Sequence, residues 1–288
     1  MNIYGFHHIT LNCRDATENV AFYRDVLGLA LIKQTVNFDD PFTYHLYYGD
    51  EKATPGTFLT FFPFVGIPKA KHGSEEIRVL KFSVASLDTA KKMLEQKGVS
   101  YATHTEFGLD CIRFTDPDGV ELSFVQVEST LPKMSFFQGL YAVEIHTHDT
   151  QTLFETLTLL GYTKQNETQL VTRFKAKDQE SFVDVVQSNQ EPYSFGYGSV
   201  HHLAFGVMDD EQRAVLQTLS QKGYMPSPII NREYFKSIYF RVGYSVLFEI
   251  ATHGPGMFID ETKLGSTLQI PKQHEKIATH IRERLQPL

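Results

Sequence analysis

One structural unit is repeated four times along this chain of 288 residues. Each copy begins with a strand-like stretch of alternating residues, continues with an amphipathic helix and then contains further strand-like runs. The first strands are predicted at residues 5–12, 78–85, 139–147 and 200–207, and the helices at 16–27, 87–97, 150–160 and 210–222. A glycine follows each helix, at the position where a left-handed conformation ends a helix at little cost: Gly28, Gly98, Gly161 and Gly223.

Strands fill the rest of each copy. Runs of β-branched and aromatic residues occupy positions 45–48, 57–62, 111–115, 122–127, 182–187, 237–241 and 246–252. Each copy is therefore a βαβββ module, and the sequence predicts an α+β fold of four modules in two domains. The domains are expected at residues 1–130 and 136–260, with the boundary in the polar segment 128–138. A C-terminal helix and tail, residues 261–288, is expected to cover the core or to form a dimer contact, because Ile277, Ile281 and Leu285 share one helical face.

Composition excludes several classes of protein. The chain has 27 basic and 34 acidic residues, a net charge of −7, and no basic cluster, which argues against a nucleic-acid partner. No apolar run has the length of a membrane span, and residues 1–8 lack the pattern of a signal peptide. Cys13 and Cys111 form no CxxC motif, which favours a reducing compartment. We therefore expect a soluble cytoplasmic protein, with a homo-oligomer left open.

Glu249 and two pairs of histidines are the polar residues that the strand pattern explains least well. Glu249 lies in the otherwise apolar run Val-Leu-Phe-Glu-Ile-Ala, and a buried carboxylate costs several kcal/mol unless it is paired or bound to a metal. His7-His8 and His201-His202 open the first strands of the first and fourth modules. Because side chains alternate across a strand, one histidine of each pair can face a cavity shared with Glu249. The alternative is an edge strand with Glu249 in water and histidines that play structural parts.

The other modules provide an internal comparison. The positions equivalent to His202 and Glu249 in the second module are Val79 and Ser123, and the position equivalent to His8 in the third is Ala142. These modules cannot rebuild the site, which leaves two histidines and one carboxylate. That set with open coordination positions is typical of non-haem Fe(II) that binds substrate and oxygen, whereas a structural zinc site needs a fourth ligand. Zn, Mn or Ni could replace iron in a purified sample.

Other histidines provide weaker signals. His45 could approach the site. Glu144, His146 and His148 alternate with apolar residues and are interpreted as the solvent-facing side of a half-buried strand. The remaining histidines lie in polar surroundings and indicate nothing specific: His72, His104, His253, His274 and His280.

At these positions the chain resembles the vicinal oxygen chelate superfamily, and more closely its two-domain, hydroquinone-type ring-cleaving dioxygenases. The resemblance covers nearly the whole chain. In the N-terminal half it rests on Gly-Phe-His-His-Ile-Thr at 5–10, Thr-Val-Asn-Phe-Asp-Asp-Pro at 35–41 and Tyr-His-Leu-Tyr-Tyr-Gly-Asp at 44–50. In the C-terminal half it rests on His-His-Leu-Ala-Phe at 201–205, Ser-Ile-Tyr-Phe-Arg at 237–241 and Leu-Phe-Glu-Ile-Ala-Thr at 247–252. Residues 242–245 depart from the proline-glycine turn usual in the family.

The resemblance implies Fe(II) bound by His8, His202 and Glu249. It also implies second-shell residues around the substrate: His7, Thr10, His201, Arg232 and Tyr239. The expected reaction is cleavage of a small hydroquinone-type aromatic diol by O₂. Two alternatives stay open: a glyoxalase-like metal-dependent isomerase or lyase, which usually needs a second carboxylate, and a metal-free ligand-binding protein of the resistance type.

The position of the three ligands also predicts how the modules pair. His8 belongs to the first module, and His202 and Glu249 belong to the fourth. If the first module paired with the second, no cavity would contain all three residues. We therefore expect the first module to pair with the fourth and the second with the third within one chain, as in the related dioxygenases. Contact between two chains of a dimer is the alternative.

Overall fold

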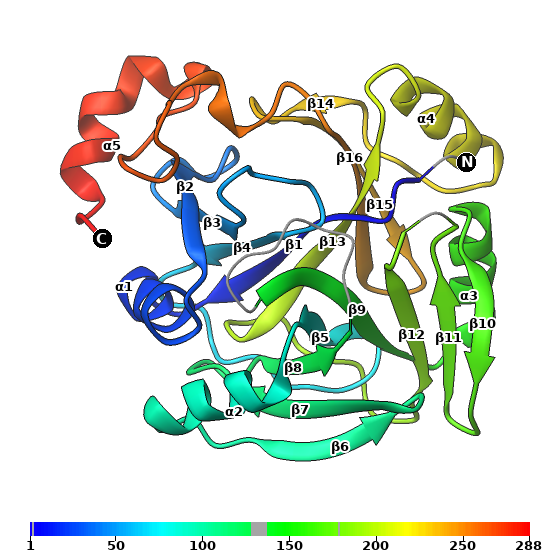
Figure 1. Ribbon diagram of the computed structural model, residues 1–288. Helices are drawn as coiled ribbons and strands as arrows, with labels where there is room; N and C mark the ends of the chain where they lie inside the picture. Colours follow the sequence, from blue (N-terminus) through cyan, green and yellow to red (C-terminus); the bar gives the residue numbers. More distant parts are fainter. Residues whose placement is uncertain (2, 128–136, 178) are drawn as a thin grey trace.

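The computed structural model describes residues 1, 3–127, 137–177 and 179–288. Sixteen strands within these residues form two mixed sheets of eight strands each (Figure 1). The first module contains β1 (Phe6–Cys13), β2 (Ala30–Val36), β3 (Tyr44–Gly49) and β4 (Phe58–Pro63). The second contains β5 (Glu76–Val84), β6 (Ala102–Glu106), β7 (Leu109–Thr115) and β8 (Glu121–Gln126). The third contains β9 (Phe137–Thr147), β10 (Thr163–Glu167), β11 (Val171–Lys175) and β12 (Phe182–Gln187), and the fourth contains β13 (Ser199–Val207), β14 (Ile230–Asn231), β15 (Lys236–Val242) and β16 (Val246–Thr252).

The pairing of the modules follows the expected intrachain arrangement. One sheet has the strand order β14-β15-β16-β13-β1-β4-β3-β2, and the other has the order β10-β11-β12-β9-β5-β8-β7-β6. The antiparallel pairs β1–β13 and β5–β9 join the modules at the centre of each sheet. The first module therefore shares a sheet with the fourth, and the second with the third, so the prediction is confirmed. The assignment of residues 1–130, 136–260 and 261–288 to separate domains stays a prediction, and residues 128–136 lie outside the described part of the chain.

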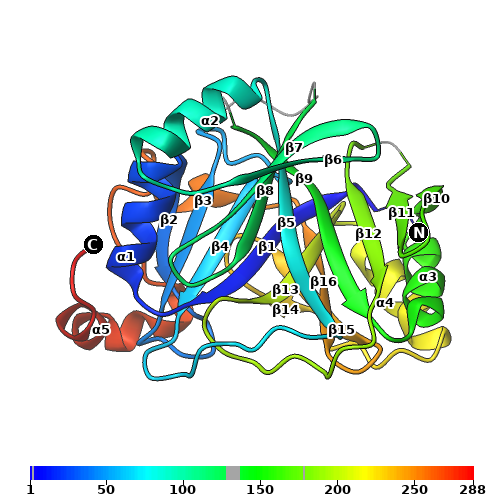
Figure 2. The same cartoon turned by 90° about the horizontal axis from the view of Figure 1, so that it is seen from below.

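The four predicted module helices are present. They are α1 (Ala16–Val20), which continues into a π-helical segment (Ala21–Val26), α2 (Leu87–Gln96), α3 (Thr150–Leu159) and α4 (Gln212–Gln221). Asp15, Ser86 and Asp149 cap the first three by accepting a hydrogen bond from a backbone N–H three residues later. Each helix is followed by its predicted glycine with positive φ, between 70° and 90°. Figures 1 and 2 show α1 and α2 together at one side of the molecule and α3 and α4 at the other.

The connections between modules also pair with each other. Residues 69–74, which lead from the first module to the second, form bridges with residues 192–197, which lead from the third to the fourth. Glycine is needed at two points of this crossing. A Cβ atom on Gly73 would lie 2.0 Å from the carbonyl oxygen of Glu191, and one on Gly196 would lie 2.3 Å from that of Pro68. The two connections therefore lock the sheets to each other through close backbone contact.

The C-terminal tail folds back on the first module. It contains two 3₁₀ segments (Met257–Ile259 and Lys272–Ile277) and α5 (Ala278–Arg284), which begins later than the predicted helix. Ile281 is completely buried and Leu285 packs partly against the core, whereas Ile277 is 40% exposed. The buried ammonium group of Lys33 on β2 lies 2.7 Å from Asp260 and 2.6 Å from Glu261, which anchors the tail. Among the described residues, no helix has the length and the apolar surface required to cross a membrane.

Candidate metal centre

Three adjacent strands position the predicted ligands on one face of the first sheet. His8 and Thr10 lie on β1, where Thr10 pairs with His202 on β13 and His8 pairs with Ala204. Ala204 in turn pairs with Glu249 on β16. The strands are buried and rich in apolar residues because the sheet is covered on both sides, so these polar side chains lie inside the protein. His8, His202 and Glu249 are 1%, 4% and 0% exposed.

The donor atoms of these three residues converge. His8 Nε2 lies 3.1 Å from His202 Nε2, and Glu249 Oε2 lies 3.3 Å and 2.9 Å from these two nitrogens. Adjacent ligands of an octahedral divalent ion with bonds of about 2.1–2.2 Å are about 3.0 Å apart, so the spacing suits such an ion. Glu249 Oε2 is fully buried and, within the described part of the chain, has no hydrogen-bond partner other than these two imidazole nitrogens. A cation among the three atoms would satisfy that oxygen, so the residues present fit a divalent metal.

Each candidate ligand is oriented by a neighbour. His8 Nδ1 lies 2.8 Å from His7 Nδ1, and His202 Nδ1 lies 2.8 Å from His201 Nδ1. Ser237 donates a hydrogen bond of 2.5 Å to Glu249 Oε1. Metal-binding histidines usually donate their second ring N–H to such a partner, which fixes the ring and the tautomer. A proton on Nδ1 of His8 and His202 leaves both Nε2 atoms free to bind a metal.

Burial controls the electrostatics of the site. It lowers the pKa of His202, and with the charge of His202 it lowers the pKa of His201 to about 3. Burial alone would raise the pKa of Glu249, but the imidazoles of His8 and His202 outweigh it and hold that pKa well below its usual range. The carboxylate is therefore ionised and His201 and His202 are neutral at pH 7, as metal binding requires.

An aromatic-lined pocket of about 390 Å³ opens onto His8 and His202, and its volume is within the usual size range of small-molecule sites. Its walls combine apolar rings with a few polar groups, and they come from the first and fourth modules. The lining residues are His8, Asn37, Phe38, Asp39, Asp40, His45, Tyr47, Phe62, Phe64, His201, His202, Arg232, Phe235, Tyr239 and Leu247. Arg232 donates to the hydroxyl of Tyr239 at 3.3 Å and to Asp39 at 3.1 Å. The pocket therefore presents the guanidinium of Arg232 and the phenol of Tyr239 at its wall beside the candidate ligands.

Four of the five residues predicted to surround the substrate lie at the pocket or in contact with a side chain that lines it. His201, Arg232 and Tyr239 line the pocket, and the hydroxyl of Thr10 lies 2.9 Å from His202 Nε2. His7 differs, because it is 1% exposed and contacts the rings of Phe58, Phe235 and His253. It lines none of the described pockets. A register shift between Phe6 and His8 in the β1–β13 pairing accompanies this placement behind His8.

Three residues that connect to the site through hydrogen bonds were not among the predicted site residues: Tyr47, His45 and Thr60. The hydroxyl of Tyr47 lies 3.0 Å from His45 Nδ1, and His45 Nε2 lies 3.0 Å from the hydroxyl of Thr60. Thr60 in turn is 2.7 Å from Thr10. His45 was recognised only as a residue that could approach the site. The alternation that puts His45 and Tyr47 on one face of β3 was the available signal, but the parallel register of Thr10 with Thr60 has no trace in the sequence.

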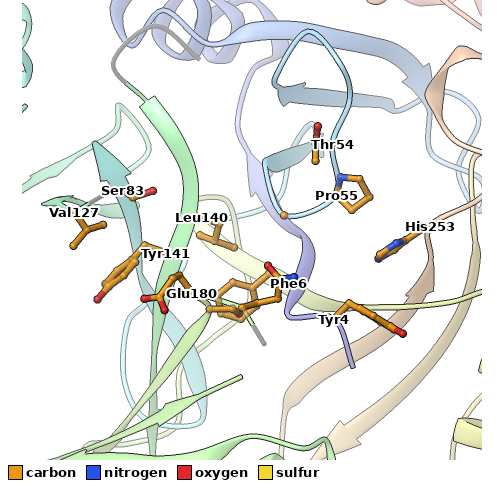
Figure 3. A pocket seen from close by; sticks show the side chains of 13 residues that line it. Tyr4, Phe6, Thr54, Pro55, Ser83, Val127, Leu140, Tyr141, Glu180 and His253 are labelled. Atoms are coloured by element: carbon orange, nitrogen blue, oxygen red, sulfur yellow. The ribbon is translucent and has the colours of Figure 1, made fainter. Parts of the chain in front are cut away.

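A second cavity, of about 250 Å³, lies elsewhere between the modules and is shown in Figure 3. Its wall includes Tyr4, Phe6, Leu140, Tyr141 and His253, but none of the three candidate ligands. Because it lacks a converging set of donor atoms, it is a weaker candidate for chemistry.

The fold and this cluster of donor atoms together define a class of protein. Residues 5–124 match the family model described as the Glyoxalase/Bleomycin resistance protein/Dioxygenase superfamily, and the chain belongs to this superfamily. It is 37% identical to the "Putative ring-cleaving dioxygenase MhqE" of Bacillus subtilis over the full length of both chains. It is 28% identical to a chlorohydroquinone/hydroquinone 1,2-dioxygenase of Sphingobium indicum, with 96% of this chain and 94% of the relative covered.

A solved structure supports the same grouping. The crystal structure titled as a putative dioxygenase from Bacillus subtilis superposes with a TM-score of 0.94 at 33% identity, covering 100% of this chain and 98% of that chain. The expected resemblance to this superfamily and the expected fold are thus confirmed.

Proposed function

We propose that this protein is an Fe(II)-dependent dioxygenase that uses O₂ to cleave the ring of a small hydroquinone-type aromatic diol. The observation that supports this most strongly is the convergence of His8, His202 and Glu249 at the end of an aromatic-lined pocket. Two histidines and one carboxylate that leave positions open are typical of non-haem Fe(II) oxygenases. The names of the relatives, ring-cleaving and hydroquinone dioxygenases, agree with the proposal.

His8, His202 and Glu249 would hold the ion, which when bound would supply a Lewis-acidic, redox-active position for a ring oxygen and O₂ together. The protein supplies an enclosed, mostly apolar space. Phe62, Phe64 and Phe235 line it and exclude water from the face of a bound ring. The pocket volume of about 390 Å³ accommodates a single substituted ring.

Arg232 and Tyr239 are proposed to select the para-diol. The two oxygens of a hydroquinone lie at opposite ends of the ring, so one ion cannot bind both, and the far hydroxyl needs hydrogen-bond partners from the protein. Burial, together with the charge of Glu249, raises the pKa of Tyr239, so its O–H remains a donor at neutral pH. Burial would lower the pKa of Arg232, but Tyr239 and Asp39 outweigh this, so its guanidinium remains charged.

Thr10 is proposed to move a proton. Its hydroxyl lies beside His202 Nε2 and continues through Thr60 to His45 Nε2, with successive distances of 2.9, 2.7 and 3.0 Å. Burial lowers the pKa of His45 well below its usual value, so His45 is neutral before reaction and holds an accepted proton only weakly, as a proton relay requires. This chain of hydroxyls links a proton acceptor to the reacting end of the pocket.

Oxygen uptake by the anaerobically iron-loaded protein tests the proposal. Hydroquinones are expected to support faster uptake than catechol, and Tyr239→Phe is expected to slow the hydroquinone reaction more than any catechol reaction, because both catechol oxygens can bind the ion. Absence of uptake with every diol, or uptake with catechol well above every hydroquinone, would contradict the proposal. A glyoxalase-like isomerase would turn over without oxygen, and it usually needs a second carboxylate, whereas this cluster has one among the described residues.

A further inference from the structure

The sheet formed by the second and third modules contains its own group of metal-binding side chains. His104 and Glu106 lie on β6, and Cys111 lies on β7. One ligand atom from each of the three residues lies within 4.8 Å of the others. We propose that His104, Glu106 and Cys111 form a second metal site, selective for a borderline-soft divalent ion such as Zn²⁺. This site is independent of the proposed dioxygenase chemistry, because it shares no residue and no sheet with the first.

The hairpin geometry explains why these residues converge. His104 and Cys111 are direct partners in the antiparallel β6–β7 pair, and Glu106 follows His104 by two positions. Directly paired residues and residues two apart share one face of a sheet, within reach of a common ligand. Phe107 and Gly108, which join the strands, both have positive φ, at 48° and 78°, as a tight two-residue hairpin requires. The three side chains are thus held together by the shortest connection between two strands.

Two ligand atoms lack any other partner. His104 Nε2 and Glu106 Oε2 are both buried and make no hydrogen bond to any residue that the structure describes. Cys111 is 2% exposed, and its thiol donates a weak hydrogen bond to the carbonyl oxygen of Leu109, at 3.4 Å. Buried polar atoms without partners are costly and uncommon in folded proteins. A cation bound by the three residues would satisfy both orphaned atoms at once.

Neighbouring charges determine which ion would bind. Glu106 Oε1 already accepts a hydrogen bond of 2.5 Å from Lys81, and Lys81 also lies 2.8 Å from both Glu144 and Asp184. Arg113 lies 2.7 Å from Glu144. Because these cations balance the carboxylates, the site has little excess negative charge for a hard ion such as Mg²⁺. The sulfur and imidazole ligands instead form the strong bonds that Zn²⁺ and Co²⁺ favour.

The protonation states suit this assignment. Burial lowers the pKa of His104, so its imidazole is neutral at pH 7. Burial, reinforced by Glu106, raises the pKa of the Cys111 thiol to about 11, so binding must displace the thiol proton. An ion can reach the site, because His104 and Glu106 are both only partly buried. Three protein ligands leave a fourth tetrahedral position for water or a small ligand.

Titration of the metal-free full-length protein with Co²⁺ tests the proposal. Thiolate coordination produces a charge-transfer band in the near ultraviolet, and the proposed dioxygenase site cannot produce one because it contains no cysteine. The wild-type protein is expected to bind two Co²⁺ ions and to show this band, with about one proton released at the cysteine. Cys111→Ser is expected to bind one ion and to lose the band.

Cys13→Ser is the matched control, because Cys13 and Cys111 are the only cysteines in the chain. This variant is expected to retain the band, and Glu249→Gln is expected to retain it while losing the other ion. Zn²⁺ should abolish the band by displacement, whereas excess Mg²⁺ should not. His104→Ala is expected to weaken Co²⁺ binding at this site at least tenfold. Absence of the band in the wild-type protein, or its persistence in Cys111→Ser, would overturn the proposal.

Discussion

At the scale of single residues, Glu249 is a carboxylate in an unusual, fully buried environment. It is completely buried, one oxygen is held by Ser237, and the other faces two imidazole nitrogens without a hydrogen-bond donor. Glu249→Gln is expected to weaken Fe(II) binding strongly and to abolish turnover, because a neutral amide loses its charge attraction to the ion. Ser237→Ala keeps the charge and is expected to weaken binding by only about 10–100-fold. Anaerobic Fe(II) titration measures both; full iron occupancy and normal turnover in Glu249→Gln would reject the assignment.

Asp116 gives a residue-scale prediction about pH. It accepts hydrogen bonds from Tyr23 and from the backbone of Asp118 and Val120, yet burial raises its pKa to about 6. The folded state therefore binds more protons than the unfolded state between about pH 4 and pH 6, and this residue makes the free energy of unfolding rise as pH falls through that window. From pH 7 to pH 4, the wild-type protein is expected to gain about 2–3 kcal/mol relative to Asp116→Asn. Denaturant unfolding of both proteins at several pH values checks this. If the difference between their free energies of unfolding is the same at pH 7 and pH 4, the prediction is wrong.

Single residues also show how far the sequence predicted the site. Glu249, His8 and His202 stood out because equivalent positions in the repeated modules carry Val79, Ser123 and Ala142, an internal comparison that needs no structure. The support of Glu249 by Ser237 and of Thr10 by Thr60 depends on strand register, which alternation alone does not determine. Side-chain alternation predicted that one histidine of each pair faces the shared cavity, and His7 lies outside the pocket that His8 lines, but the register shift beside His7 was not indicated by the sequence.

At the scale of elements, the two sheets differ in what their polar side chains surround. In the sheet of the first and fourth modules they surround the candidate metal site, and in the sheet of the second and third modules they surround a buried lysine. Lys81 on β5 is completely buried and contacts Glu106, Glu144 and Asp184. Glu144 was expected on a solvent-facing side of its strand, and this expectation is wrong, since it is only 7% exposed. The alternation of polar and apolar residues around Glu144 correctly predicted a strand with one polar and one apolar face. The polar face, however, contacts charged groups from β5, β6 and β12 rather than water. Pattern alone cannot distinguish these two environments.

Removal of this cation is expected to be costly. Lys81→Met leaves three carboxylates without their ammonium partner and should lower the free energy of unfolding by about 3–5 kcal/mol. Lys92→Met, an exposed lysine of α2, is the matched control and should change it by less than about 0.5 kcal/mol. Denaturant unfolding of both variants gives the measurement. Equal stabilities for the two variants would show that the network contributes nothing.

At the scale of the whole molecule, the repeated pattern predicted both the modules and their pairing, because only one pairing brings all three candidate ligands together. The sequence did not predict the crossing of residues 69–74 with residues 192–197, since it depends on close backbone contact at Gly73 and Gly196. Irregular connections of this kind lack the periodicity that identifies strands and helices. The tail was predicted to contain a helix, but its anchor at Lys33 was not.

The pairing predicts the behaviour of a divided chain. If residues 1–135 and 136–288 are expressed together as separate fragments, they should associate, because each fragment supplies half of each sheet. The complex should bind Fe(II) and gain melting temperature from it, whereas residues 136–288 alone should not, since His8 is absent. Co-purification through a tag on one fragment and thermal melting with and without Fe(II) measure this. Tight iron binding by residues 136–288 alone would show that His8 is not a ligand.

The pairing of the first module with the fourth also has a consequence for the synthesis of the protein. His8 and His202 are 194 positions apart, so at about 5–20 residues per second the ribosome adds His202 roughly 10–40 s after His8. Strands β5 to β12 all precede β13 in the chain, so the second and third modules can begin to form their own sheet before β13 is made, while β1 has no β13 to pair with. The proposed metal centre would therefore form last, and a nascent chain without β13 would lack a complete site for the proposed reaction of iron and oxygen.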